Sequence, residues 1–224
     1  MNVRTFHSVN NFIITILIVI LGVTGSVCAQ NLPQIAQAGQ VLQWDRILDA
    51  YDRCIDYPSY DNAKALLAAL PVDRLNEQRG DPDMVLLHMF SGDGYPILYE
   101  EAISGDRIAI EIHFRLLNIT DGLYSEIVET TLGWLARDQP LVFLEILMTY
   151  KDTRHMKWHG YPVSFIGSGH NTHPRAALFI LEKRIAALES VMDQKYAEIK
   201  EACIKQLRSA IDERVRLIER KIPQ

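Results

Sequence analysis

Four of the seven histidines gather in one short window of the chain, as His155, His159, His170 and His173. The spacings H-x3-H and H-x2-H allow imidazoles to converge on one metal ion. Zinc, copper or nickel would suit such ligands. Glycine and proline directly follow the first pair, so its helical register is open, and the alternative is a set of solvated or packed loop histidines.

Two cysteines, Cys54 and Cys203, remain if a leader ending at Ala29 is removed. Each lies on or beside the apolar stripe of its predicted helix. An even number of cysteines in an oxidising compartment favours pairing. We therefore expect a Cys54–Cys203 disulfide that joins the first and last long helices. The alternative is two buried, unpaired thiols.

Other catalytic patterns are missing or stand in the wrong context. Gly167-Ser168-Gly169 places a serine between glycines, but the nucleophile motif G-x-S-x-G needs another spacing and a strand-to-helix turn. The chain contains no H-E-x-x-H, P-loop or G-x-G-x-x-G motif. Asn118-Ile119-Thr120 is a glycosylation sequon on a predicted link between helices. The absence of catalytic motifs favours a non-enzymatic role.

Charge and composition limit the classes of partner. The chain has 224 residues, with 23 Lys and Arg against 28 Asp and Glu and a net charge of −5. We expect no nucleic-acid partner, because such proteins carry a basic patch or stripe. The length fits one domain with a substantial core.

The first 29 residues have the three-part layout of a secretory signal peptide. Arg4 precedes the apolar run Phe12–Leu21, and Val27-Cys28-Ala29 ends in a small residue. We predict cleavage after Ala29, export to the periplasm or the medium, and a mature domain, residues 30–224, that does not insert into the membrane. The alternative is an uncleaved anchor, since no charged residue follows Arg4 within this stretch.

Apolar residues recur at helical spacing through the mature chain, and no segment keeps the period of two that is typical of strands. We therefore predict an all-α fold. Capping residues and prolines indicate where the helices begin and end. The predicted helices cover residues 33–56, 63–70, 84–90, 97–103, 107–117, 122–136, 141–150 and 193–221.

Residues 151–172 are predicted to form a long loop, because glycines and prolines interrupt them. Besides histidines the loop carries Trp158, Tyr161 and Phe165. Long connections within compact domains are usually functional or disordered. We expect this loop to be the most mobile internal segment and the place of any ligand contact. Thr172 is then predicted to cap a helix that runs to Glu189.

The middle of the chain, about Pro96–Tyr150, resembles the HEAT-like class of helical hairpin proteins in its arrangement. Links of two to four residues force neighbouring helices to be antiparallel. Leu98-Tyr99 is also echoed by Leu123-Tyr124. The resemblance implies stacked antiparallel hairpins in a right-handed α-α arrangement, closed by a long C-terminal helix. The chain also resembles exported bacterial α-helical proteins.

The leading hypothesis is therefore an exported helical scaffold or binding module that binds a protein or peptide and needs no cofactor. The alternative is a metal-binding or metal-dependent envelope protein. It would use the histidines between positions 155 and 173 and a transition metal such as zinc.

Overall fold

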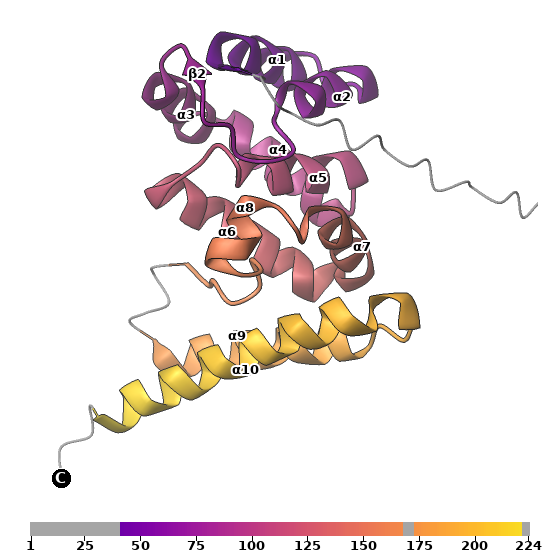
Figure 1. Ribbon diagram of the computed structural model, residues 1–224, viewed down its shortest axis with the longest axis vertical. Coiled ribbons are helices and arrows are strands. Elements are labelled where there is room, and N and C mark those ends of the chain that lie inside the picture. The colour runs from indigo at the N-terminus through magenta and orange to yellow at the C-terminus, as the bar shows by residue number, and fades with distance from the viewer. Residues whose placement is uncertain (1–40, 168–172, 221–224) are drawn as a thin grey trace, which may run out of the picture. The chain divides into compact units, whose positions relative to one another are not determined.

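The computed structural model describes residues 41–167 and 173–220, and helices make up most of this part (Figure 1). The predicted all-α class is confirmed there, since the only strands are two of two residues each. In chain order the elements are β1 (Leu42–Gln43), α1 (Trp44–Asp56), α2 (Tyr60–Ala69), β2 (Gln78–Arg79), α3 (Pro82–Ser91), α4 (Gly94–Ser104), α5 (Arg107–Leu116), α6 (Gly122–Asp138), α7 (Pro140–Tyr150), α8 (Arg154–His159), α9 (Pro174–Glu189), the 3-10 helix η3 (Gln194–Tyr196) and α10 (Ala197–Arg220).

Several helix ends lie where the capping residues predict them. The side chains of Ser59, Asp81 and Asp106 each accept a hydrogen bond from a backbone N–H three residues later, which satisfies a donor that the helix leaves unpaired. Gly105 ends α4 with a φ of 96°, in the left-handed region that glycine adopts without strain. Asp121 precedes α6 as predicted, but its side chain makes no capping hydrogen bond.

The first predicted helix begins later than its apolar periodicity suggests. Residues 33–40 lie outside the described part, and Leu42–Gln43 is extended and pairs in parallel with Gln78–Arg79. Trp44 then starts α1, is 1% exposed, and donates its indole N–H to the Gln78 side chain. This pairing with a distant segment overrides the local helical preference, which the pattern of one segment cannot reveal.

Consecutive helices pack against each other: α1 with α2, α4 with α5, α6 with α7, and α9 with α10. Helix α5 also contacts α2, α6 and α7, so it lies at the centre of the core. Helix α9 packs against both α6 and α10, and α10 also contacts α7 and η3. In Figure 1 the α9–α10 pair lies at one end of the described helices, and the α1–α2 pair lies at the other.

This arrangement contradicts the predicted Cys54–Cys203 disulfide. Both cysteines are free and buried, Cys54 on α1 and Cys203 on α10. The two helices lie at opposite ends of the described helices (Figure 1). Burial raises the pKa of the Cys203 thiol to about 12, and burial, with a smaller contribution from Glu101, raises the pKa of the Cys54 thiol. The prediction was wrong because an inward-facing cysteine does not specify which helix lies opposite.

Within residues 41–167 and 173–220, no helix combines the length and the apolar character needed to cross a lipid bilayer. The predicted leader, its cleavage site after Ala29 and the alternative of an uncleaved anchor all fall outside the described residues.

Candidate functional site

The segment predicted as a loop, 151–172, is largely structured where it is described. Its first half contains α8, and beyond that helix Val163 and Ile166 are buried, with no more than 1% of either residue exposed. Buried apolar side chains anchor the segment to the core, which loop composition alone did not indicate. Residues 168–172, and with them His170 and Thr172, lie outside the described part. His173 occupies the N-cap position of α9.

Helix α8 brings two of the four predicted metal ligands together. His155 and His159 are four residues apart and therefore share one helix face, and their ring centroids are 4.9 Å apart. His155 is 8% exposed, whereas His159 is exposed. Among the described residues His173 makes no hydrogen bond or ring contact with either of them. As they stand, no three His, Cys, Asp or Glu side chains in that part form a group that could hold an ion.

The structure adds a carboxylate that the sequence analysis missed. Glu129, on α6, places Oε1 3.4 Å from His155 Nε2, and both side chains are mostly buried. The buried Nε2 atom has no hydrogen-bond partner, so this approach is not a hydrogen bond. No local signal could identify Glu129, because α6 and α8 are separated by the whole of α7.

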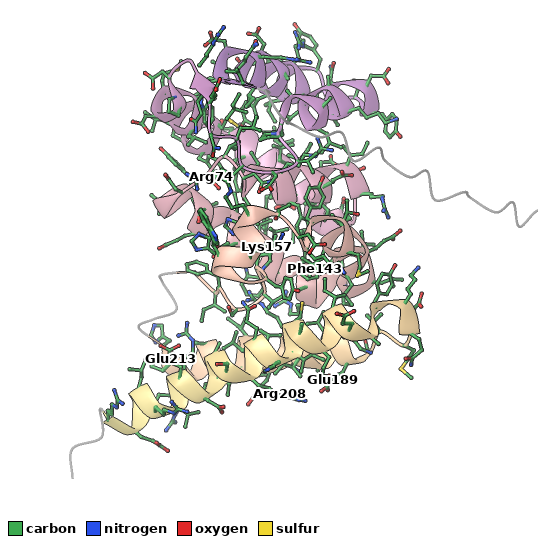
Figure 2. All side chains as sticks on the ribbon, viewed as in Figure 1. Arg74, Phe143, Lys157, Glu189, Arg208 and Glu213 are labelled. Atoms are coloured by element: carbon green, nitrogen blue, oxygen red, sulfur yellow. The ribbon has the colours of Figure 1, made fainter. Side chains whose placement is uncertain are left out.

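A cavity of about 340 Å³ lies between residues 159–167 and α10, with one residue of α6 at its edge. Its lining residues are Glu129; His159, Gly160, Tyr161, Pro162, Ser164, Phe165, Ile166 and Gly167; and Gln206, Ala210, Glu213, Arg214 and Leu217. Figure 2 labels Glu213, a lining residue, on α10. Part of the segment in which we expected ligand contact, residues 159–167, therefore forms one wall of this cavity.

Gln206 fixes this wall from the α10 side. Its Oε1 accepts from the Tyr161 backbone N–H at 2.9 Å, and its Nε2 donates to the Tyr161 carbonyl at 2.7 Å and to Ser164 Oγ at 3.1 Å. One amide side chain thus satisfies both backbone groups of Tyr161. Gly160, with a φ of 79°, allows the close approach, because a Cβ there would lie 2.8 Å from Gln206 Oε1.

Arg184, on α9, fixes the same wall through two further backbone carbonyls. Its side chain is fully buried, and NH1 donates to the carbonyls of Val163 and Phe165, both at 2.6 Å. Gly133 on α6 makes room for the guanidinium group, since a Cβ at that position would lie 2.5 Å from Arg184 Cζ. Residues 161–165 are therefore held by Gln206 and Arg184 together.

The Arg184 guanidinium has fewer partners than it could use. Its Nε and NH2 atoms are buried without a hydrogen-bond partner. Cζ lies 5.5 Å from the centre of the Trp134 ring, a cation–π contact. Burial, and to a smaller degree the charge of Arg137, lowers the pKa of Arg184 to about 9. The group is therefore charged at neutral pH, and α9 carries a buried cation.

A second cavity, of about 290 Å³, lies among α1, α2, α4 and α5. Its lining is mainly aliphatic, with Cys54 on one side and the carboxylates of Glu101 and Asp106 at its edge. Asp106 is already engaged as the cap of α5. This cavity therefore offers fewer free polar groups than the one beside α10.

The sequon at Asn118 is not an accessible acceptor. Asn118 is 3% exposed, and its Nδ2 donates to the carbonyls of Val72 at 2.8 Å and Pro71 at 3.4 Å. A glycan on this nitrogen would require both bonds to break. The side chain instead ties the end of α5 to the link after α2.

No family model, no curated protein and no solved structure matches this chain. Function is therefore inferred from the chemistry of its own residues. The cavity beside α10 combines aromatic and aliphatic walls with two carboxylates, an imidazole and a guanidinium at its edge. Such a lining suits reversible binding of an amphipathic ligand.

Proposed function

We propose that the protein is an exported binding module that holds a short peptide segment of a partner in the cavity between residues 159–167 and α10. The observation that carries the proposal is the fixed wall of this cavity. Gln206 and Arg184 together make hydrogen bonds to four backbone groups and one side-chain hydroxyl of the wall. A ligand that binds a wall already in position loses less free energy to ordering than one that must order a mobile loop.

The size and lining of the cavity support a peptide side chain as the ligand. A volume of about 340 Å³ is at the lower end of the roughly 300–1,000 Å³ typical of small-ligand sites. Phe165 and Leu217 provide apolar contact, and Glu213 and His159 provide polar groups near the solvent. One or two side chains of an amphipathic peptide would fit this pattern.

The proposal is tested by selecting peptides from a displayed random library on the full mature chain and measuring their affinity by fluorescence anisotropy. Leu217→Asp places a charge in the cavity wall and should weaken binding about tenfold or more, since burying an unpaired charge is costly. Leu141→Asp is the matched control, because Leu141 on α7 is 50% exposed and Leu217 is 48% exposed. Equal affinities of the two variants, or no selected peptide, would contradict the proposal.

We also propose that the chain reaches the envelope through removal of residues 1–29. The support is the charge, apolar run and small residues of the leader. Intact mass of the protein recovered from the envelope fraction tests it, with an N-terminus at Gln30 expected. A mass that retains residues 12–21 would establish the anchor alternative instead.

The finer arrangement that we propose for about residues 96–150 is a HEAT-like, right-handed stack of antiparallel hairpins. Its support is the packing of α4 on α5 and α6 on α7, together with the links of only a few residues between them. Cross-linking of engineered cysteine pairs on the facing sides of α4, α5, α6 and α7 tests the handedness of these hairpins. Left-handed connections between successive helices would exclude the HEAT-like arrangement.

A further inference from the structure

The pair formed by His155 and Glu129 differs from the other imidazole–carboxylate pair of the described residues. His88 Nε2 lies 2.8 Å from Asp52 Oδ1, at the surface, in a normal hydrogen bond. His155 Nε2 lies 3.4 Å from Glu129 Oε1, is buried, and has no hydrogen-bond partner. A buried polar atom without a partner is uncommon in folded proteins and calls for an explanation.

The 3.4 Å separation between these two atoms has a simple geometric meaning. Nitrogen and oxygen ligands lie roughly 2.0–2.2 Å from a tetrahedral zinc ion. At the tetrahedral angle, two such ligand atoms are about 3.3–3.5 Å apart, which follows from those bond lengths. The distance between His155 Nε2 and Glu129 Oε1 is therefore long for a hydrogen bond and right for two ligands of one ion.

A second imidazole lies beside the pair. His159 is one turn after His155 on the same face of α8, with the ring centroids 4.9 Å apart. As they stand, the side chains of the described residues do not bring a third such donor to a common point. The His159 ring is exposed, however, and the broad torsion about its Cβ–Cγ bond allows the ring to turn at little cost.

We propose that Glu129, His155 and His159 bind one transition-metal ion of the zinc type, with His159 turning its ring to complete the set. Two imidazoles and a carboxylate are ligands that Zn²⁺ accepts, and three protein ligands leave a fourth position open. Glu129 and His159 both line the cavity beside α10, so the open position would lie next to it. This goes beyond peptide binding, and it replaces two of the four histidines of the sequence-based set with a carboxylate from α6.

The site is tested by titrating Zn²⁺ into the full mature chain, freed of metal with a chelator, and following the heat of binding. One ion per chain is expected. Glu129→Gln and His159→Ala should each weaken binding by at least the roughly 10–100-fold that loss of even an outer-shell partner costs. Thermal melting of each variant without metal checks that the fold is retained.

Two control variants separate this site from its rivals. His88→Ala removes an imidazole that already pairs with Asp52. His173→Ala removes a histidine of the sequence-based set that makes no hydrogen bond or ring contact with the described residues of α8. Both variants should bind Zn²⁺ as tightly as the unmodified chain. Cobalt(II) in place of zinc should give the visible absorption of a four-coordinate site, lost in His159→Ala. The proposal is overturned if no stoichiometric binding occurs, if Glu129→Gln binds as tightly as the unmodified chain, or if His173→Ala is as damaging as His159→Ala.

Discussion

Two arginines of this protein hold backbone carbonyl groups, and they do so in opposite ways. Arg115 on α5 donates Nε to Tyr150 Oη at 2.8 Å and NH1 to the carbonyls of Leu67 and Leu70 at 2.8 and 3.1 Å. Its NH2 approaches Glu111, which supplies a negative charge. Arg184 on α9 is fully buried, and only its NH1 is bonded.

The difference separates a region whose polar groups are mostly paired from the region in which we propose ligand binding. Arg115 satisfies the last carbonyls of α2 and is itself satisfied, so it joins α2, α5 and α7 with little cost of burial. Arg184 holds the wall of a cavity while its charge lacks a carboxylate in contact. Buried polar atoms without partners are concentrated here: of the six such side-chain atoms in the described part of the chain, Thr153 Oγ1, His155 Nε2 and two of Arg184 belong to the α8–α9 region. Strain of this kind is characteristic of functional sites.

The largest effect is expected at Arg115. Arg115→Met should lower the free energy of unfolding by about 2–3 kcal/mol, because two backbone carbonyls lose charged donors in a mostly buried position. Arg107→Met is the control, since its pair with Glu145 is half exposed and should contribute less than about 1 kcal/mol. Urea unfolding at pH 7 measures both. Equal losses would remove the distinction between a networked and a surface arginine.

The region whose polar groups are mostly paired also holds one buried group whose partners are incomplete, His113. Its Nδ1 donates to the Ala109 carbonyl at 2.7 Å, and its Nε2 has no partner. Burial lowers the pKa of His113 from 6.5 to about 4. The unfolded chain therefore takes up the proton first as the pH falls, and the free energy of unfolding decreases between pH 6.5 and 4.

From pH 7 to pH 5 this decrease should reach about 2 kcal/mol for the single group. Urea unfolding at the two pH values in unmodified protein and in His113→Leu isolates it, since carboxylates contribute equally to both. A pH dependence that is the same in the two proteins would show that His113 is not neutral and buried as described.

A smaller effect on stability is expected at Arg184. Arg184→Met removes two hydrogen bonds to the cavity wall, but it also removes a buried charge without a paired carboxylate. These contributions oppose each other, and replacement of buried charges by apolar side chains is often nearly neutral. We expect the free energy of unfolding to change by no more than about 1 kcal/mol.

The local effect of Arg184→Met should be clear even so. Amide hydrogens of residues 163–167 should exchange faster with solvent, because the wall loses one of its two anchors. Hydrogen exchange followed by mass spectrometry measures this segment by segment. A loss of global stability as large as that of Arg115→Met, without faster exchange at the wall, would reverse the comparison between the two arginines.

Local signals predicted the helices well, and distant contacts explain what they missed. Ser59, Asp81, Asp106 and Gly105 lie at helix ends because each acts on a backbone group within four residues. Leu42–Gln43 is extended because of a partner more than thirty residues away, which no short window contains. The 151–172 segment was predicted as a loop for the same reason, since the bonds that hold it come from Arg184 and Gln206.

The sequence drew attention to the segment that contains α8, but it did not indicate which side chains from other helices lie beside it. The H-x3-H spacing singled out His155 and His159 but left their register open, and α8 places the two rings 4.9 Å apart. Glu129 could not be found, because a carboxylate on a regular amphipathic helix looks like any solvated residue until α8 packs beside it. Arg184 was equally hidden, since an arginine in a helix is ordinarily exposed.

The smallest effect is expected from the cysteines, and it distinguishes the described packing from the disulfide predicted from the sequence. A bridge closing so long a loop would stabilise the fold by roughly 4–5 kcal/mol in the chain-entropy model. With Cys54 and Cys203 free on α1 and α10, a reductant should leave the free energy of unfolding unchanged. Alkylation of the denatured, unreduced mature chain, residues 30–224, should modify two thiols. The folded protein should react slowly, because both thiols are buried and the pKa of each is raised. A single bridged species in the mass spectrum of the unreduced protein would require α1 and α10 to meet, and the described packing of α10 on α9, α7 and η3 would have to be abandoned.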